Sequence, residues 1–530
     1  MYSHTDDILT LVNHHRLIKE RLIADPYRPG YHFAVPSDNG IPGDPNGAFY
    51  ANGRYHLMYL YQCRADGFRW GHMSSIDLVH WHHHPDALIP DDLDGGIFSG
   101  GAYVDEDGCV YLSYWALPGK ETKGGIRVAY SNDAEHHYES WTKVPEYAIS
   151  GTHFGFSEDH DENGVLFYRG ASDPSNIWKK DGRYYMEAGA LEVLNRFRND
   201  PNAPAQYRGD WTDLYSTDDP KKGNWRYEHR FYQRDVENRW TQESEDDMCP
   251  SFYPLPATKA GGVMSDKYLQ TFIAHNRGTQ YYIGTYDRER DLLIPEQHGR
   301  MSWVDNTYFA PEAILTPDGR YVLFAWLLDN QKDELTRFGW SGVYALPREL
   351  WLNEQGGLGI APHRELAMLE YGAAQGDDAL TKTDKKSRRL TLTARVGANG
   401  KVGFRLFANA EGTAYADLYY DAERRELIFD ESKAGKLNCA SPDVTPWIDP
   451  ATREPVLAER APFALEAGEL LTLTCYIDGP VMDAFANDRQ AITRRVCTEN
   501  PDARREVSLL CENGEILSLD GCSMMPSNMY

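Results

Sequence analysis

The stretch GDPNGAFYANGRYHLMYLY, residues 43–61, is the basis of the fold prediction. It begins with the pair Asp44-Pro45 and continues with two runs of Tyr and aliphatic residues that are separated by Asn-Gly. An Asn-Gly turn between such runs is typical of a β-hairpin. The same layout returns in SDPSNIWKKDGRYYM, residues 172–186, where Asp173-Pro174 precedes a hairpin with an Asp-Gly turn. The sequence therefore predicts a structural unit, opened by an Asp-Pro turn, that occurs more than once.

Hairpins of this kind recur from Tyr31 to about residue 367, and no helical segment interrupts them. Such a series predicts repeated four-stranded sheets, as in a β-propeller, with a large sandwich or a solenoid as the alternative. The number of blades does not follow from the sequence, because no strict repeat is present. Equivalent turns of successive blades face one end of the central channel. We therefore expect Asp44 and Asp173 to converge there.

The chain is predicted to be all-β and to have four parts. Residues 1–28 form an N-terminal extension with a short amphipathic helix, because apolar residues recur there near helical spacing. Residues 29–367 form the propeller, and residues 368–386, rich in Gly, Ala, Asp and Lys, form a linker. Short strand patterns resume after the linker and predict a C-terminal β-sandwich over residues 387–530.

Composition limits the classes of function. The 530 residues carry a formal net charge of −26, which disfavours nucleic acid and anionic membranes as partners and favours a neutral substrate. The eight cysteines form no CxxC pair and have no zinc-like spacing, which argues against a metal site. No persuasive Gly-rich phosphate loop is present, and no cofactor is expected. The first residues resemble neither a signal peptide nor a membrane anchor, which predicts a cytoplasmic protein.

A third acidic motif, ESEDDMCPSF, occupies residues 243–252. Each of the three motifs has a purely structural interpretation: the two Asp-Pro motifs as turns that enter hairpins, and the acidic run as a solvated loop. Together, however, they supply the paired carboxyl groups that glycoside hydrolysis requires, one ionised and one holding a proton through a raised pKa. Acids that crowd one end of a channel raise the pKa of their neighbours by mutual repulsion.

In their order along the chain, these motifs resemble glycoside hydrolase family 32, the family of invertases, inulinases and levanases. Residues 41–47 resemble the family's Trp-Met-Asn-Asp-Pro-Asn-Gly, residues 172–174 its Arg-Asp-Pro, and residues 248–250 its Glu-Cys-Pro. The resemblance covers about residues 30 to 515 and includes these further segments: Trp70-Gly71-His72, Phe98-Ser99-Gly100-Gly101, Phe309-Ala310-Pro311-Glu312, Gly339-Trp340-Ser341-Gly342 and Ala484-Phe485-Ala486-Asn487-Asp488. It implies a propeller of five blades followed by a β-sandwich.

The resemblance also implies roles for individual residues. Asp44 matches the nucleophile and Asp173 the stabiliser of the transition state. The predicted sugar-binding residues are Trp70, Phe98, Ser99 and Trp326. The acid/base does not carry over directly, because Met248 stands where the family has Glu. Divergent members with a Glu-Asp-x-x-Cys-Pro pattern place this role on Glu245, and the alternatives are Glu243, Asp246 and Asp247. Three further departures predict a rebuilt sugar site: Gly43 for Asn, Leu60 for Gln and Ser172 for Arg.

The predicted activity is retaining hydrolysis of β-fructofuranosyl bonds in sucrose or short fructooligosaccharides through a fructosyl-enzyme intermediate. A fructosyltransferase, including one that forms or cleaves difructose anhydrides, is the nearest alternative, because these motifs do not determine whether water or a sugar accepts the fructosyl group. A non-catalytic fructan-binding protein is a second alternative, suggested by the departures from the family pattern. The predicted partner is a small neutral saccharide, and the oligomeric state does not follow from the sequence.

Overall fold

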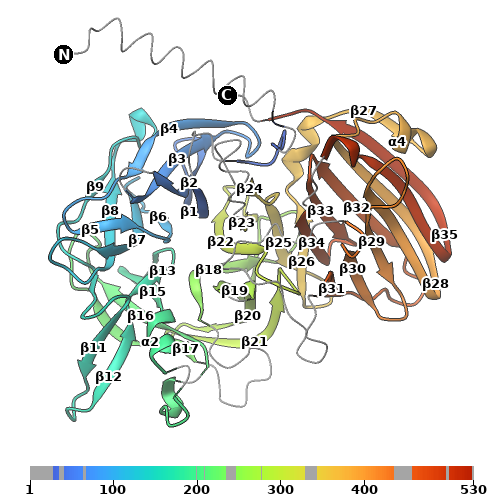
Figure 1. Ribbon diagram of the computed structural model, residues 1–530. Coiled ribbons are helices and arrows are strands. Elements are labelled where there is room, and N and C mark those ends of the chain that lie inside the picture. Colours follow the sequence, from blue (N-terminus) through green and yellow to red (C-terminus); the bar gives the residue numbers. More distant parts are fainter. Residues whose placement is uncertain are drawn as a thin grey trace, which may run out of the picture.

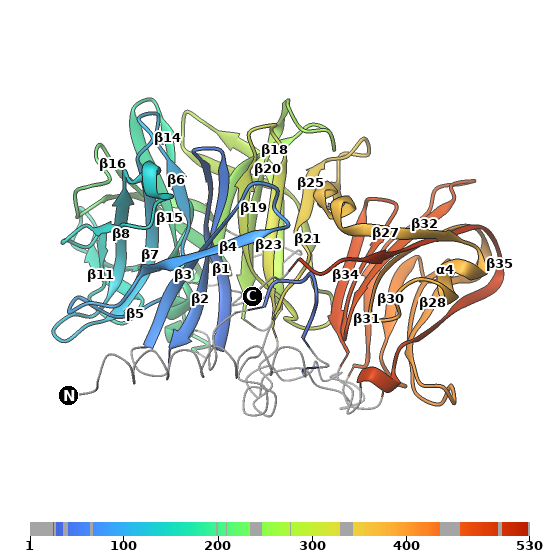
Figure 2. The same cartoon turned by 90° about the horizontal axis from the view of Figure 1, so that it is seen from above.

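The computed structural model describes residues 25, 28–34, 41–63, 67–197, 200–207, 209–233, 246–275, 277–328, 343–434, 456–496 and 501–527 of the chain. A ring of five β-sheets lies beside a two-layered β-sandwich (Figures 1 and 2). The predicted five-bladed propeller with a C-terminal sandwich is thus confirmed. The short helix predicted for residues 1–28 falls almost wholly outside the described residues.

Each blade is built from strands that follow one another in the chain, and all neighbouring strands are antiparallel. Blade 1 contains β1 (Ile41–Ala51), β2 (Arg54–Cys63), β3 (Gly67–Ser75) and β4 (Trp81–Leu88). Blade 2 contains β5 (Asp94–Ile97), β6 (Ala102–Val104), β7 (Val110–Pro118), β8 (Gly125–Ser131), β9 (Thr142–Lys143) and β10 (Ile149–Ser150). Blade 3 contains β13 (Ser172–Pro174), β14 (Trp178–Lys180), β15 (Arg183–Gly189), β16 (Trp211–Thr217) and β17 (Arg226–Gln233).

The last two blades complete the ring. Blade 4 contains β18 (Met248–Pro256), β19 (Met264–Ala274), β20 (Gly278–Asp287) and β21 (Leu292–Arg300). Blade 5 contains β22 (Tyr308–Leu315), β23 (Tyr321–Leu327), β24 (Val343–Tyr344), β25 (Arg348–Leu352) and β26 (Leu358–Pro362). The segment before blade 1 reaches blade 5, where the backbone N–H of Tyr344 donates to the carbonyl of Phe33 at 2.8 Å.

The inner strands of four blades share one irregularity. A residue-proline pair interrupts each of them: Asp44-Pro45, Asp173-Pro174, Cys249-Pro250 and Ala310-Pro311. The register of pairing with the next strand shifts at each of these pairs. Proline has no N–H to give to the ladder, so a bulge forms at that point and re-aims the residue beside it. Cys249 and Ala310 also take positive φ angles, of 49° and 48°. The bulges therefore turn the residues before the prolines out of the ladders.

Two long, bent strands connect the layers of the sandwich. β28 (Ser387–Ala408) and β35 (Glu506–Met524) pair along most of their length. The first half of β28 joins the layer of β32 (Leu471–Asp478), β33 (Val481–Ala486) and β34 (Gln490–Arg495). Its second half joins β29 (Ala416–Asp421), β30 (Glu426–Asp430) and β31 (Ala458–Pro462). Leu390, Leu392, Phe404, Leu418 and Leu473 are among the fully buried residues between the layers.

Residues 368–386, predicted as a linker, contain β27 (Glu370–Gln375) and α4 (Asp377–Thr381). β27 pairs with β35 of the sandwich. The proposed domain boundaries stay predictions.

The layer formed by β32–β34 packs against blades 4 and 5. Leu350 of blade 5 shares one apolar cluster with Tyr476 and Phe485 of this layer. Arg494 crosses the same interface and lies 2.8 Å from Asp305 of the propeller. The sandwich thus supports the propeller from one side.

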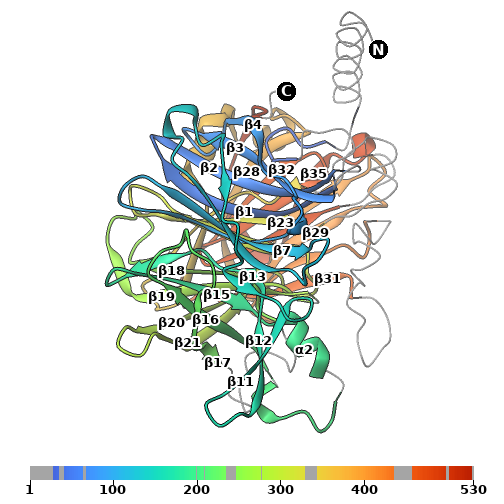
Figure 3. The ribbon, with the colours of Figure 1, turned by 90° about the vertical axis from the view of Figure 1, so that its left-hand side faces the viewer.

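The remaining elements are short. The hairpin of β11 (Phe156–His160) and β12 (Leu166–Gly170) extends from the ring beside α2 (Leu191–Phe197), as Figure 3 shows. The 3-10 helices are Ala134–His136, Ala205–Tyr207, Arg364–Leu369 and Pro501–Ala503. Among the ranges given above, no helix is long and apolar enough to cross a membrane.

Candidate active site

Asp44 lies in the bulge of β1, where blade 1 meets blade 2. Its Oδ2 accepts a hydrogen bond from the Ser99 hydroxyl, which follows β5 in blade 2. The Asn46 side chain connects the same two blades: its Nδ2 donates to the Asp44 carbonyl at 2.9 Å, and its Oδ1 accepts from the Gly100 N–H at 3.0 Å. The Ser99 bond thus holds the Asp44 carboxylate against blade 2, and Asn46 ties the backbone of the bulge to the same blade.

Asp173 and Cys249 bring blades 3 and 4 to the same place. Asp173 is 5% exposed and lies in the bulge of β13. The Cys249 thiol lies 3.3 Å from Oδ2 of Asp173 and 3.6 Å from Oδ2 of Asp44, so it can donate to either carboxylate. The structure therefore gathers Asp44, Ser99, Asp173 and Cys249 from four blades into one cluster.

The two carboxyl groups of this cluster differ in their electrostatics. Burial raises the pKa of Asp44, while the Ser99 hydrogen bond and the positive charge of His275 lower it. Burial and the negative charge of Asp44 raise the pKa of Asp173 to about 7. Burial, with both carboxylates nearby, holds the pKa of the Cys249 thiol well above its usual value, so the thiol stays protonated. The cluster can therefore hold one carboxylate ionised while the other keeps a proton near neutral pH.

His275 is a residue of this site that the sequence analysis missed. It follows β19, one strand outward from Cys249, and its side chain is 52% exposed. Asp246 accepts hydrogen bonds from the His275 backbone N–H at 3.0 Å and from the ring Nδ1 at 2.6 Å. Asp246 itself is buried, and sequence reasoning had considered it only as an alternative proton donor. No motif around His275 signals this pairing, because the two residues are 29 positions apart.

The predicted sugar-binding residues take different positions. Trp70 is fully buried, and its Nε1 donates to the Phe98 carbonyl at 3.1 Å, so it supports the Phe98-Ser99 turn from behind. Phe98 is half-buried and directly precedes Ser99. Trp326 is half-buried on β23, and its ring lies 6.0 Å from that of Phe309, in an apolar cluster that includes Cys249. Phe98 and Trp326 thus lie near the carboxylates, and Trp70 lies behind them.

A row of aromatic rings extends outward from Phe98. Its ring centroid lies 5.4 Å from that of Trp115, which in turn lies 5.2 Å from that of Phe154. Phe154 is 43% exposed. Flat aromatic faces of this kind suit the apolar faces of sugar rings. Trp115 and Phe154 were not predicted, because nothing in their sequence context distinguishes them from core aromatics.

The third motif is only partly described. Glu243 and Glu245, the latter the predicted acid/base, lie outside the described residues. Met248, which stands where the family has Glu, is 1% exposed, and its sulfur lies 3.7 Å from the Ser172 hydroxyl. Asp247 is fully buried, with a φ of 37°. The buried, apolar side chain of Met248 thus occupies the position at which the family motif has an acid.

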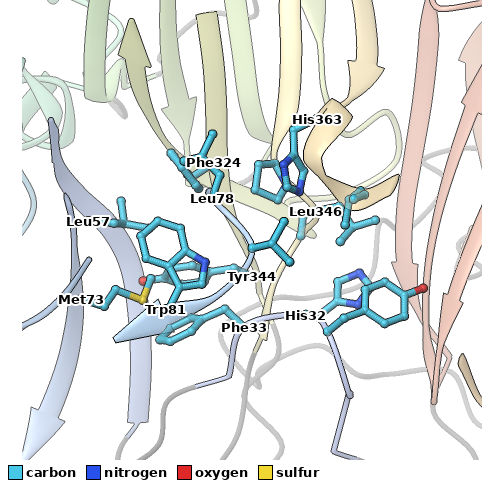
Figure 4. A pocket seen from close by; sticks show the side chains of 15 residues that line it. His32, Phe33, Leu57, Met73, Leu78, Trp81, Phe324, Tyr344, Leu346 and His363 are labelled. Atoms are coloured by element: carbon cyan, nitrogen blue, oxygen red, sulfur yellow. The ribbon is translucent and has the colours of Figure 1, made fainter. Parts of the chain in front are cut away.

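Two cavities lie apart from this cluster. One, of about 30 Å³, lies where Tyr31–Phe33 crosses between blades 1 and 5, and His32, Trp81 and Phe324 are among the residues that line it (Figure 4). It has room for about one or two water molecules and is too small for a sugar. The other, of about 320 Å³, lies further along the central channel, where residues of all five blades line it: Tyr50, Tyr103, Ile177, Tyr253 and Ile314. Neither contains a carboxylate of the cluster.

Within the part of the chain that the structure describes, no group of three His, Cys, Asp or Glu side chains is placed to hold a metal ion.

Comparisons with known proteins agree with this architecture. Residues 32–362 match the family model "Glycosyl hydrolases family 32 N-terminal domain", and residues 366–522 match "Glycosyl hydrolases family 32 C terminal". The chain is 27% identical over 367 residues to an insoluble-isoenzyme β-fructofuranosidase of Arabidopsis thaliana, a match that covers 62% of this chain but only 54% of that protein. It is 30% identical over 374 residues to a sucrose-6-phosphate hydrolase of Klebsiella pneumoniae, covering 67% and 70% of the two chains.

A solved structure shows the same fold. The crystal structure of fructan 1-exohydrolase IIa from Cichorium intybus superposes with a TM-score of 0.74 at 20% identity, covering 95% of this chain and 98% of that one. The two family models together span most of the chain, in the order propeller then sandwich. The chain therefore belongs to glycosyl hydrolase family 32 and is a glycosidase of the β-fructofuranosidase-like type.

Proposed function

We propose that this chain hydrolyses β-fructofuranosyl bonds in sucrose or short fructooligosaccharides by a retaining double displacement. The observation that carries the proposal is the convergence of Asp44, Asp173 and Cys249 from three blades at one end of the channel. The names of the relatives support the fructosyl unit as the group transferred.

In the proposed mechanism, Asp44 is the nucleophile. Ser99 and Cys249 hold its Oδ2 by hydrogen bonds, which orient the carboxylate and favour its charged form despite burial. Asp44 attacks C2 of the fructosyl unit while the glycosidic bond breaks, and a covalent fructosyl-enzyme forms. Water then attacks the same carbon, fructose is released, and Asp44 returns as a carboxylate.

Asp173 is proposed as the stabiliser of the transition state. It would accept hydrogen bonds from the sugar hydroxyls as positive charge develops on the ring, because a pKa of about 7 leaves a fraction of this carboxyl group ionised near neutral pH. Glu245 is proposed as the acid/base that protonates the leaving oxygen and later activates water. This assignment rests on the motif resemblance, since the described residues begin again at Asp246.

The proposed substrate is short and uncharged. The net charge of −26 disfavours an anionic sugar, and Phe154, exposed at the outer end of the aromatic row, offers an apolar face rather than a cation. We therefore expect a higher kcat/KM for sucrose and a trisaccharide than for polymeric inulin, polymeric levan or sucrose 6-phosphate. A reversed order would contradict this part of the proposal.

Substitution of the nucleophile tests the mechanism. Asp44→Asn keeps the size of the side chain but removes its charge, so we expect kcat to fall by about 10⁴-fold or more while the protein stays folded. Asp266→Asn, a change to an exposed residue of β19, is the matched control and should keep full activity. A tenth of wild-type activity in Asp44→Asn would exclude Asp44 as the nucleophile.

Product analysis separates the related reactions. With methanol as acceptor, retention gives methyl β-fructofuranoside, which NMR distinguishes from the α anomer that inversion would give. At high sucrose, free fructose as the main product supports hydrolysis. Trisaccharides or difructose anhydrides as the main product would show that the enzyme is a fructosyltransferase instead.

A further inference from the structure

His275 is held beside the carboxylate cluster by contacts with three residues, one of which, Phe309, shares an apolar cluster with Cys249. Asp246 binds both its backbone N–H and its ring Nδ1. Asn306 Nδ2 donates to the His275 carbonyl at 2.7 Å, and the Phe309 ring stands edge-on to the imidazole with 5.7 Å between centroids. A side chain anchored at backbone, ring nitrogen and ring face has a defined position, although it is half-exposed at the channel end.

We propose that His275, held by Asp246, is a positioning residue whose imidazolium charge keeps Asp44 ionised for attack. This inference rests on the proposed role of Asp44 as nucleophile. His275 acts through Asp44 rather than on the substrate itself.

The charges around the ring support this role. The negative groups that act on His275 are Asp246 before β18, Asp173 on β13 and Asp44 on β1. Desolvation disfavours the charged ring, but these three carboxylates outweigh it and raise the pKa of His275 to about 9. The ring is therefore charged throughout the neutral range, and its charge lowers the pKa of both Asp44 and Asp173.

If the ring loses its charge, the pKa of Asp44 rises, so a larger fraction of the enzyme is protonated and inactive at low pH. A positive charge near a carboxyl group lowers its pKa, and solvent at a half-exposed ring reduces the effect. We therefore expect removal of the charge to move the acidic limb of kcat/KM upward, by about 0.5–1 pH unit.

Three variants test the inference through the pH profile. His275→Gln removes the charge but keeps a donor for Asp246, and His275→Lys restores the charge without the ring. We expect the acidic limb to move upward in His275→Gln and to return toward the wild-type position in His275→Lys. His160→Gln, at an exposed histidine of β11, is the matched control and should leave the limb unchanged. An unshifted limb in His275→Gln, or equal shifts in the Gln and Lys variants, would overturn the inference.

An NMR titration of the histidine-labelled wild-type enzyme gives a readout that does not depend on turnover. The signal that is absent from His275→Gln should titrate near pH 9, and should titrate at a lower pH in Asp246→Asn. Titration at or below the ordinary value of about 6.5 would refute the inference even if the enzyme is active. If the wild type cleaves no fructoside, the proposed function fails, while the titration still decides whether His275 carries the charge.

Discussion

His32 joins the propeller to the sandwich, and its protonation is predicted to stabilise the fold. Its Nδ1 lies 3.0 Å from Oδ2 of Asp478, and its Nε2 lies 2.8 Å from Oδ2 of Asp483. All three side chains are completely buried. Asp478 also accepts the backbone N–H groups of Gly30, Tyr31 and His32, at 2.7–2.9 Å. One imidazolium therefore compensates two buried carboxylates at the interface of the two domains.

The magnitude follows from the pKa of His32. Burial alone would lower it, but hydrogen bonds to Asp478 and Asp483 raise it from 6.5 to about 9. At about 1.36 kcal/mol per pH unit, this rise corresponds to about 3 kcal/mol of stability. Because the folded-state pKa lies above the unfolded-state value, this stability is fully present below about pH 6.5. It is lost as the pH rises through about 9.

Replacement by glutamine removes the titrating group while keeping a donor. We expect His32→Gln to reduce the free energy of unfolding by about 3 kcal/mol more at pH 6.5 than at pH 9.5. Urea unfolding followed by tryptophan fluorescence at the two pH values measures the difference. His160→Gln should show no such pH-dependent loss. Equal destabilisation of His32→Gln at both pH values would refute the reasoning, because it would mean that the ring is neutral in the folded protein.

Two further predictions concern the site. Cys249→Ala removes a hydrogen-bond donor from Asp44 and Asp173, so the pKa of both carboxyl groups should rise and the acidic limb of kcat/KM should move to higher pH. Cys249→Ser keeps a donor and should stay close to wild type. A pH profile of kcat/KM for each variant checks this prediction. Met248→Glu places an unpaired acid at a fully buried position and should lower the free energy of unfolding by about 3–5 kcal/mol. Adding Ser172→Arg should restore part of this loss. A double-mutant cycle measured by urea unfolding would show the interaction between the two positions.

Most of the fold could be predicted because its signals are local. The turns Asn52-Gly53 and Asp181-Gly182 mark hairpins, and hairpins repeated without helices favour a propeller. Residue-proline pairs are a further local signal, which the sequence analysis applied only at Asp44-Pro45 and Asp173-Pro174. Cys249-Pro250 and Ala310-Pro311 form bulges of the same kind as the two Asp-Pro pairs, so the recurrence of residue-proline pairs marks the inner strands of four blades.

The contacts within the site could not be predicted in the same way, because they join distant parts of the chain. Cys249 lies beside Asp44 only after four blades have closed, and the sequence analysis gave it no role in the site. The bond between Asp246 and His275 bridges a loop and the end of β19, and no spacing rule connects the two. The same holds for Trp115, whose place beside Phe98 depends on the pairing of β7 with its neighbours.

Ser172 and Met248 both depart from the family pattern, and their contact with each other explains why they depart together. The family's Arg-Asp-Pro and Glu-Cys-Pro motifs would place opposite charges at these two positions, and here the Ser172 hydroxyl lies 3.7 Å from the Met248 sulfur. Both side chains are buried, at 0% and 1% exposure, so loss of one charge alone would leave its partner buried and uncompensated. Joint replacement by a hydroxyl and a thioether avoids that cost. The two departures thus fit together as one structural change at the start of β18, and in the proposed mechanism a group other than residue 248 supplies the proton.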